Sequence, residues 1–213
     1  GAVEVDLIKD KIDVLVSGSQ KAIMLPPGVA FVAYSDRAKD RFAEVTTPRF
    51  YLDLNKYLSS QEQNSTPFTP NVALFRGVNA YVELVKHEGL NHVIKRHYSI
   101  RNALRTALKS LDLELLVKDD SYASPTVTSF VPKDKEELTY LKDQLKSRFN
   151  ITIAGVQGHL KGHILRIGHM GKVSPFDILS VVSEIEILLT ESRNKNYIGK
   201  GIAQFMEVIK HES

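Results

Sequence analysis

Two short apolar runs near the start of the chain place the strongest constraint on its fold. Residues 12–16 and 29–34 are almost entirely apolar, and each is too short to form a buried helix. Such runs are typical of strands that are buried within a sheet. Gly18 and the Pro-Pro-Gly sequence at 26–28 lie between them and are typical of turns. The sequence therefore predicts part of an α/β layer in this region.

Helical patterns follow these strands. A short helix is expected over residues 37–45, capped by Ser35 or Asp36. Residues 50–70 are polar and lie among three prolines, so they are expected to form a long irregular connection. Apolar residues then recur at helical spacing on either side of Gly89, which indicates two long helices separated by that glycine.

The pattern changes to α+β after the second of these helices. Ser174, Pro175 and Asp177 form a strong helix start, with a capping residue, a first-turn proline and an acid at the third position. We place the domain boundary so that residues 1–88 form one domain and residues 89–213 form another. The other elements expected are strands at 113–117, 126–131, 151–154 and 163–167, a helix opened by Asp134 and Glu137, and a last helix at 202–209.

Composition limits the classes of partner. The 28 basic and 25 acidic residues are spread along the chain, without the basic stripe that nucleic-acid binding requires. No apolar run approaches the roughly 20 residues that cross a bilayer, and the first residues lack a signal-peptide pattern. The chain has no cysteine, which excludes a disulfide scaffold and a thiolate metal site. We expect a cytoplasmic protein with no nucleic-acid and no membrane partner.

Lys21 is the first candidate functional residue. A lysine just past a strand is most often simply solvated, but here Ser19 and Gln20 offer hydrogen-bonding groups that suit a phosphate. The run Ser-Gly-Ser-Gln-Lys-Ala at 17–22, followed by Leu-Pro-Pro-Gly at 25–28, closely resembles the cofactor-lysine segment of class V aminotransferases. The resemblance implies that Lys21 forms the Schiff base with pyridoxal 5'-phosphate, and that Ser19 and Gln20 also bind this cofactor.

A lysine suits this chemistry for two reasons. Its free amine attacks the aldehyde of the cofactor, which supplies the electron sink. Once the amino acid has displaced it, the same amine can carry a proton between the substrate α-carbon and the aldehyde carbon, as a general acid and base.

Arg166 is the candidate for substrate binding. It lies in the run Leu-Arg-Ile-Gly at 165–168, which resembles the family segment whose arginine binds the substrate carboxylate. A planar guanidinium matches a carboxylate with two parallel, charge-assisted hydrogen bonds. The alternative is an arginine at an exposed strand edge that pairs with a nearby acid. His169 follows closely and is a further candidate to line the substrate pocket.

Thr66 and Thr69 lie in the run Thr-Pro-Phe-Thr-Pro at 66–70. The resemblance implies a homodimer, in which a threonine of this loop reaches the cofactor phosphate of the other subunit. We favour Thr69 for this contact, because the spacing of the loop varies among relatives. Hydroxyl groups suit a phosphate as donors, and the prolines would hold the loop in shape. A plain Ser/Thr/Pro linker is the alternative.

No metal site is expected among the seven histidines. His159 and His163 have the four-residue spacing of two ligands on a helix, but Gly162 and the strand that follows argue against a helix there. His97 lies on an apolar helix stripe, so we expect a core histidine whose hydrogen bonds are satisfied.

The resemblance covers the whole chain but only the later part of the family sequence. It implies an α/β fold, the C-terminal part of a fold-type I pyridoxal-phosphate-dependent transferase. Residues 1–88 would be the remnant of the large α/β domain, and residues 89–213 the small C-terminal α+β domain. The family aspartate that pairs with the ring nitrogen of the cofactor would fall before Gly1. We therefore expect a fragment that does not catalyse transamination alone.

For the full-length protein, the resemblance implies transfer of an amino group from alanine or serine to glyoxylate or pyruvate. Two alternatives stay open: a related aminotransferase whose donor is ureidoglycine or aminoethylphosphonate, and a subunit that is non-catalytic or completed by a partner chain. Cysteine desulfurase is disfavoured because the chain has no cysteine to accept sulfur. The family is sometimes labelled a soluble hydrogenase subunit, but nothing in this sequence would hold nickel or an iron–sulfur cluster.

Overall fold

A computed structural model of the chain describes residues 1–212. The chain forms two compact units, and the division falls between His87 and Glu88. Their assignment to a large and a small domain of a transferase stays a prediction.

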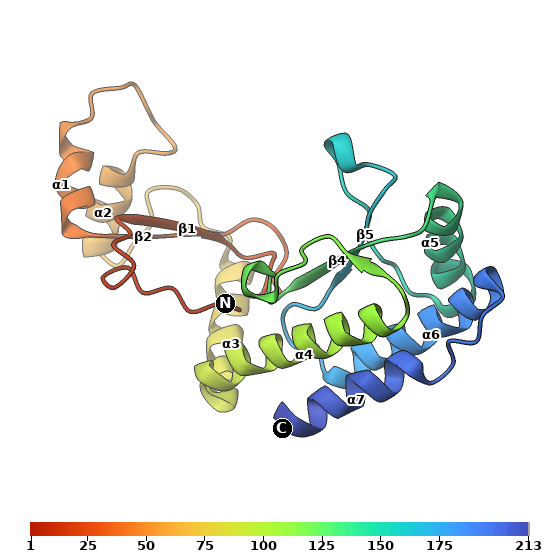
Figure 1. Ribbon diagram of the computed structural model, residues 1–213. Helices are drawn as coiled ribbons and strands as arrows, with labels where there is room; N and C mark the ends of the chain where they lie inside the picture. Colours follow the sequence, from red (N-terminus) through yellow and green to blue (C-terminus); the bar gives the residue numbers. More distant parts are fainter. Residues whose placement is uncertain (213) are drawn as a thin grey trace. The chain divides into compact units, whose positions relative to one another are not determined.

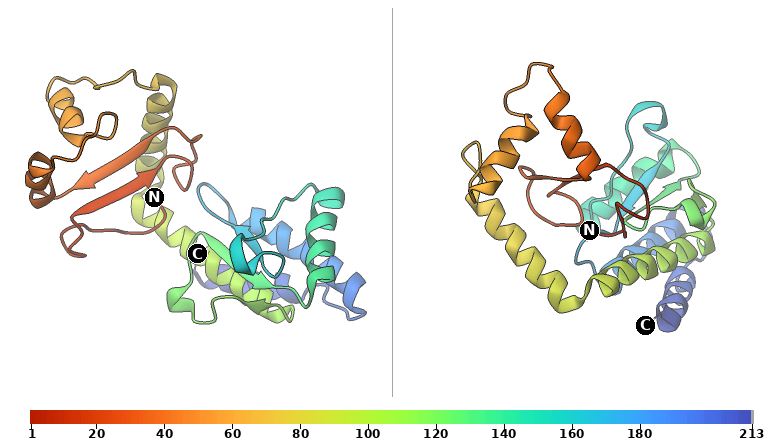
Figure 2. Two further views of the ribbon diagram at one scale, coloured as in Figure 1. Left: turned by 90° about the horizontal axis from the view of Figure 1, so that it is seen from above. Right: turned by 90° about the vertical axis from the view of Figure 1, so that its left-hand side faces the viewer.

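The first unit contains a two-stranded antiparallel sheet and three helices (Figure 1). Strand β1 (Val14–Gly18) pairs with β2 (Ala30–Tyr34), and the last pair before the connecting loop is Gly18 with Ala30. Figure 2 shows the two strands as adjacent red arrows. The helices are α1 (Asp36–Glu44), α2 (Leu54–Glu62) and α3 (Val72–Glu88).

The expected burial of these strands is wrong for this chain. The side chains of Val14 and Val16 on β1 are 45% and 66% exposed. Both strands are apolar on both faces, as in a sheet that is covered on each side. Among residues 1–212, however, no further strand joins this sheet.

Helix α2 corrects the prediction that residues 50–70 are irregular throughout. Asp53 caps this helix by accepting a hydrogen bond from the backbone N–H of Asn55, and Arg49 forms an ion pair with the same carboxylate. Asn55 in turn donates to the carbonyl oxygen of Phe42, which ties α2 to the end of α1. A short helix with one capping acid is hard to recognise among so many polar residues.

The second unit is an α+β fold with one three-stranded antiparallel sheet, in the order β3-β4-β5. Helix α4 packs against α7 and α6, and these helices enclose the core together with the sheet (Figure 1). Helix α5 packs against α6. The elements of this unit are α4 (Leu90–Ser110), β3 (Glu114–Leu115), a 3₁₀ turn at Asp120–Tyr122, β4 (Val127–Val131), α5 (Lys135–Phe149), a 3₁₀ turn at Gly158–Leu160, β5 (Leu165–Gly168), α6 (Pro175–Arg193) and α7 (Lys200–Glu212).

Local signals fix several helix ends in this unit. Ser174 and Asp177 form the expected capping box at the start of α6, with Pro175 in the first turn. Asp134 caps α5 by accepting from the N–H of Glu137, but the Glu137 carboxylate accepts from the N–H of Lys133 rather than that of Asp134. The capping box expected there is therefore only half formed.

One expected strand is absent from the described part of the second unit. Residues 151–154 pair with the sheet only at Ala154, which forms an isolated bridge with Arg166. Gly155 follows at once, and the chain leaves the sheet in a loop that carries two further glycines. Another expected strand, at 113–117, is paired only at Glu114–Leu115. Within residues 1–212, no helix combines the length and apolar character needed to cross a membrane.

Candidate functional site

Lys21 lies in the loop that connects β1 to β2, three residues beyond the last strand pair. Its side chain is exposed, and its ammonium group makes no hydrogen bond or ion pair within the described residues. The carbonyl oxygen of Lys21 accepts from the N–H of Met24 at 2.8 Å, which closes a tight turn directly after the lysine. The lysine amine is thus presented outward by a short, closed turn.

Ser19 closes the larger loop from which Lys21 projects. Its side chain is fully buried, at 0% exposure, and its hydroxyl donates to the carbonyl oxygen of Pro26 at 2.8 Å. Its backbone N–H donates to the Val29 carbonyl at 3.0 Å, and its own carbonyl accepts from Leu25 N–H at 3.0 Å. The hydroxyl is enclosed and its hydrogen is already donated within the loop, and its contact with a phosphate stays a prediction.

Gln20 is exposed beside Lys21, and its amide folds back over the glycine that precedes Ser19. A Cβ atom at Gly18 would lie 2.6 Å from the Gln20 Oε1 atom, so a larger residue at position 18 would displace this exposed amide. The Gln20 amide makes no hydrogen bond within residues 1–212. Of the two polar neighbours of Lys21, Gln20 is therefore the one with groups available for a ligand.

Thr66 and Thr69 line the same cavity of the first unit, which has a volume of about 540 Å³. The hydroxyl of Thr66 donates to the carbonyl oxygen of Phe68 at 2.8 Å, whereas the exposed hydroxyl of Thr69 makes no hydrogen bond in the described part of the chain. Phe68 anchors the loop, because its ring lies 4.9 Å from the ring of Tyr51 between centroids. Lys21 is not among the residues that line this cavity.

Arg166 lies on β5 in the second unit with its side chain exposed. Its backbone exchanges two hydrogen bonds with Ala154, at 2.7 and 3.1 Å, and its Nε–H donates to the carbonyl oxygen of Gly155 at 2.8 Å. Both terminal amino groups stay free of hydrogen bonds and ion pairs within the described chain. The alternative that Arg166 pairs with a nearby acid is therefore not observed among these residues.

The chain after β5 is fixed by two side chains of helix α4. His97 accepts a hydrogen bond from the N–H of Gly171 at 3.0 Å, and Arg96 donates to the carbonyl oxygens of Gly171 and Val173 at 2.8 and 3.0 Å. Gly171 has a φ of +83°, a backbone conformation that favours glycine. Glu88 holds Arg96 through two hydrogen bonds of 2.7 and 3.2 Å. This guanidinium lowers the pKa of the Glu88 carboxyl below its ordinary value.

The two histidines of this region are both buried. His97 is fully buried and also hydrogen-bonds to the Val93 carbonyl at 2.6 Å, which confirms a core histidine with its hydrogen bonds satisfied. His169 is fully buried against Thr128, with 2.9 Å between Nε2 and Oγ1, so the expectation that it lines a substrate pocket is wrong. Burial lowers the pKa of His169 to about 4, and the nearby His97 and Arg101 act in the same direction.

The structure thus groups the expected site residues in three places. Ser19, Gln20 and Lys21 share one loop, Thr66 and Thr69 share one cavity, and Arg166 stands on the sheet of the second unit. Sequence reasoning missed the residues that hold the chain after β5, above all Arg96. No local pattern could have revealed it, because its partner at Gly171 lies 75 residues away in the sequence.

Known proteins resemble this chain over almost its whole length. It is 42% identical to the soluble hydrogenase, small subunit, of Synechococcus sp. over 210 residues, which are 98% of this chain and 54% of that protein. Among solved structures, ureidoglycine–glyoxylate aminotransferase from Bacillus subtilis superposes with a TM-score of 0.83 at 30% identity, over 97% of this chain and 54% of that one. Pyridoxamine–pyruvate aminotransferase from Mesorhizobium loti gives a TM-score of 0.90 at 26% identity, over 100% of this chain and 55% of that one.

The chain spans about half the length of these relatives. The solved structures identify its fold as part of a fold-type I pyridoxal-phosphate-dependent transferase. The family model described as aminotransferase class-V matches residues 1–188. The chain therefore belongs to the class V aminotransferases.

Proposed function

We propose that this chain supplies the cofactor-binding lysine and the carboxylate-binding arginine of an enzyme that moves an amino group from a small amino acid to glyoxylate or pyruvate. With alanine as donor and glyoxylate as acceptor, the products are pyruvate and glycine. The observation that carries the proposal is Lys21, an exposed amine on a tightly closed loop, without a partner in the described residues.

Membership in this family implies pyridoxal phosphate as the cofactor. Bound there, it supplies an aldehyde for the lysine and an electron sink for the bonds at the substrate α-carbon. The residues of this chain fit that role: Lys21 presents an amine, Gln20 an unengaged amide, and Thr69 an unengaged hydroxyl. Thr69 would serve the phosphate of a second copy of the chain in a homodimer, as the family resemblance implies.

Lys21 would then act as a base and as an acid. The turn would hold this amine in place, and the amine could take and return one proton at the substrate α-carbon. A group that is already fixed in position lowers the free-energy barrier of such a transfer, because little entropy is lost in reaching the reactive geometry.

Arg166 would bind the carboxylate end-on. Because Gly155 already accepts from its Nε–H, the two terminal amino groups form the fork that remains for a ligand. The same fork suits the carboxylate of the donor amino acid and that of the oxo-acid acceptor, so it does not by itself select one small substrate over another.

The identity of the amino donor is the most specific part of the proposal. The two solved relatives are named for glyoxylate with ureidoglycine and for pyruvate with pyridoxamine. These names support the acceptor pair proposed here. They leave alanine, serine, ureidoglycine and aminoethylphosphonate as donors to be compared directly. The chain has no cysteine for an iron–sulfur site, so the proposal does not extend to the hydrogenase name of one relative.

A second candidate is a subunit that another polypeptide completes. It is favoured by the exposed apolar strand β1, whose Val16 is 66% exposed. In this case the same lysine and arginine serve a site that is formed on association.

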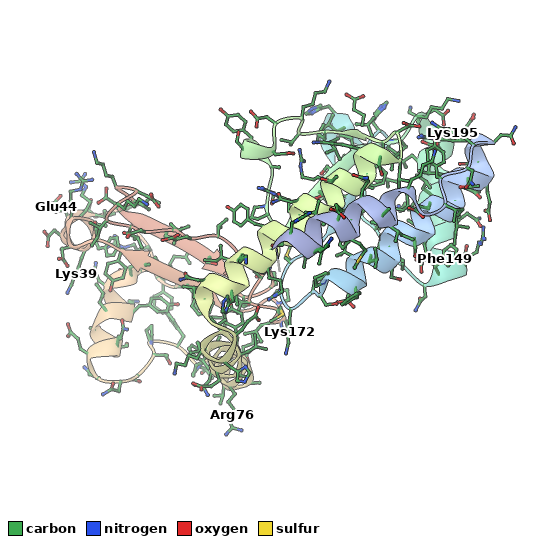
Figure 3. All side chains as sticks on the ribbon, turned by 60° about the horizontal axis from the view of Figure 1, so that its bottom comes forward. Lys39, Glu44, Arg76, Phe149, Lys172 and Lys195 are labelled. Carbon is green, nitrogen blue, oxygen red and sulfur yellow. The ribbon has the colours of Figure 1, made fainter. Side chains whose placement is uncertain are left out.

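An activity measurement separates these readings. Pyridoxal phosphate, glyoxylate and each donor are added to the purified chain, alone and with the polypeptide that matches the remaining half of the relatives, and glycine is quantified. Glycine from the chain alone supports a self-sufficient enzyme, and glycine only from the mixture supports the completed subunit. Lys21→Ala is expected to abolish glycine in either case, and Arg166→Lys to raise the KM for the donor, whereas Lys39→Ala and Arg76→Lys serve as exposed controls (Figure 3). No glycine from either preparation contradicts both readings.

A further inference from the structure

Ser19 makes a closed set of hydrogen bonds around the lysine loop. The buried hydroxyl donates a hydrogen bond to the carbonyl oxygen of Pro26 at 2.8 Å. The same hydroxyl accepts a hydrogen bond from the backbone N–H of Val29, with 3.4 Å between the nitrogen and the oxygen. The backbone of Ser19 adds the bonds to Leu25 and Val29 described above. Ser19 thus joins the two ends of the eleven-residue segment 19–29. Lys21 lies on this segment, with its side-chain amine exposed.

We propose that Ser19 is the positioning residue for Lys21, and that its hydroxyl acts through the loop rather than on the cofactor phosphate. This inference rests on the proposed function, since it assigns to Ser19 the task of holding the cofactor lysine. A hydroxyl has both a hydrogen to donate and lone pairs to accept, so it can join a carbonyl and an N–H that face each other. An apolar side chain of the same size can do neither.

The loop also contains a turn with an unusual backbone conformation around Pro26. Pro26 has no N–H of its own to donate. Met24 has a φ of +62° and Gly28 a φ of +142°, so the chain adopts left-handed conformations on both sides of Pro26. A non-glycine residue in that region persists only where its surroundings enforce it. The Ser19 hydrogen bonds lie next to this turn and hold the two segments that flank it.

The consequence for Lys21 is geometric. The turn from Lys21 O to Met24 N lies inside the ring that the Ser19 carbonyl closes with Leu25 N–H. If the hydroxyl is removed, Pro26 O loses its partner and the loop gains alternative conformations. The lysine amine then spends a smaller fraction of time where a bound cofactor requires it. Loss of one or two such hydrogen bonds corresponds to a roughly 3- to 10-fold weaker attachment of the cofactor.

A matched pair of variants in the full chain tests the proposal. Ser19→Ala removes the buried hydroxyl, and Ser17→Ala removes a hydroxyl two residues earlier that makes no hydrogen bond in the described residues. The first readout, without cofactor, is hydrogen exchange at the amides of Leu25 and Val29. The second is the concentration of pyridoxal phosphate that half-saturates Lys21, measured by borohydride reduction and peptide mapping.

The proposal expects Ser19→Ala to speed exchange at both amides and to raise the half-saturating concentration roughly 3- to 10-fold, with Ser17→Ala unchanged in both. Equal behaviour of the two variants in both readouts overturns it. Faster exchange in Ser19→Ala with unchanged half-saturation overturns it too, since the hydroxyl then holds the loop without affecting the lysine. If Ser19→Ala does not fold, Ser19→Cys and Ser17→Cys replace the pair, with the same direction expected because a thiol is a weaker donor.

A failure of the proposed function has a different signature. Wild-type Lys21 would then show no preferential labelling over exposed lysines such as Lys39, whatever the exchange data show. Preferential labelling of wild-type Lys21 with no difference between the serine variants leaves the proposed function standing and removes only the role of Ser19.

Discussion

At the scale of single residues, three buried polar side chains join separate parts of the chain. Ser19, His97 and His169 are all fully buried, and each has a hydrogen-bonding partner close by. A buried polar group that loses its partner costs more than an exposed one, because water cannot replace the lost bond. Ser19 thus joins two parts of the lysine loop, His97 holds the chain after β5, and His169 joins that chain to β4.

His169 predicts a specific dependence of stability on pH. Its pKa is about 4 in the folded chain, against about 6.5 for an unfolded histidine. Between these values the unfolded chain binds a proton that the folded chain does not, so stability is lost as pH falls from about 6.5 towards 4. The loss from this one group reaches roughly 3 kcal/mol at the acid end. Urea unfolding of wild type and His169→Gln at pH 7 and pH 5 should give a smaller pH effect in the variant.

The control for this measurement is His163→Gln, which alters an exposed histidine. It should keep the full wild-type difference between the two pH values. If His169→Gln also keeps that difference, the depressed pKa of His169 is not what makes the chain sensitive to acid.

Substitution of Arg96 is expected to destabilise the chain, whereas substitution of an exposed arginine is not. Its guanidinium binds Glu88 and two backbone carbonyls beyond β5. Arg96→Met should lower the free energy of unfolding by roughly 2 kcal/mol, because a part-buried carboxylate and two carbonyls lose a charged donor. Arg76→Met, on the exposed face of α3, should stay within about 0.5 kcal/mol of wild type. Chemical denaturation checks both, and equal effects of the two substitutions would refute the role of Arg96.

At the scale of elements, helix α7 depends on a carboxylate from α6. Glu186 is 1% exposed, and its two oxygens accept from the N–H groups of Gly199 and Ile202 at 2.7 and 2.8 Å. These donors lie at the start of α7, where a helix leaves N–H groups without internal partners and where negative charge is stabilising. The core of the second unit includes Phe205 of this helix, which is fully buried.

Glu186→Ala is expected to destabilise the chain by roughly 3 kcal/mol, since two part-buried N–H groups lose their acceptors and the buried side chain leaves a cavity. Glu186→Gln, which keeps one acceptor oxygen, should cost less. The exposed Glu136 on α5 gives the control, and Glu136→Ala should change stability by no more than about 0.5 kcal/mol. Thermal unfolding orders the three variants; a Glu186→Ala protein as stable as the control would show that α7 starts without this cap.

At the scale of the whole molecule, local chemistry decided which features could be predicted. The start of α6 follows from Ser174, Pro175 and Asp177, which act within one helical turn. Helix α2 was missed because a single cap at Asp53 carries its signal. The burial of β1 could not be judged, because it depends on what lies against the strand rather than on the strand itself.

The candidate site divides in the same way. Lys21 and Arg166 were predicted from motifs, and their exposure and lack of partners among residues 1–212 agree with a ligand-binding role. That role stays a prediction until it is tested. The hydrogen bond from Ser19 to Pro26 was not predicted, since a serine beside a lysine looks the same in the sequence whether it faces a phosphate or a backbone carbonyl. The hydrogen bonds of His97 and Arg96 to Gly171 join positions that are 74 and 75 residues apart, which no local pattern encodes.

The most direct test of the central claim is the site at which the chain takes up pyridoxal phosphate. The purified chain is mixed with the cofactor, its absorbance spectrum is recorded, and borohydride reduction is followed by digestion and mapping of the labelled peptide. A new absorbance band with the label concentrated on Lys21, and little on the exposed Lys39, is the result that the account predicts. A label spread over many exposed lysines, with no preference for Lys21, would contradict the assignment of this lysine to the cofactor.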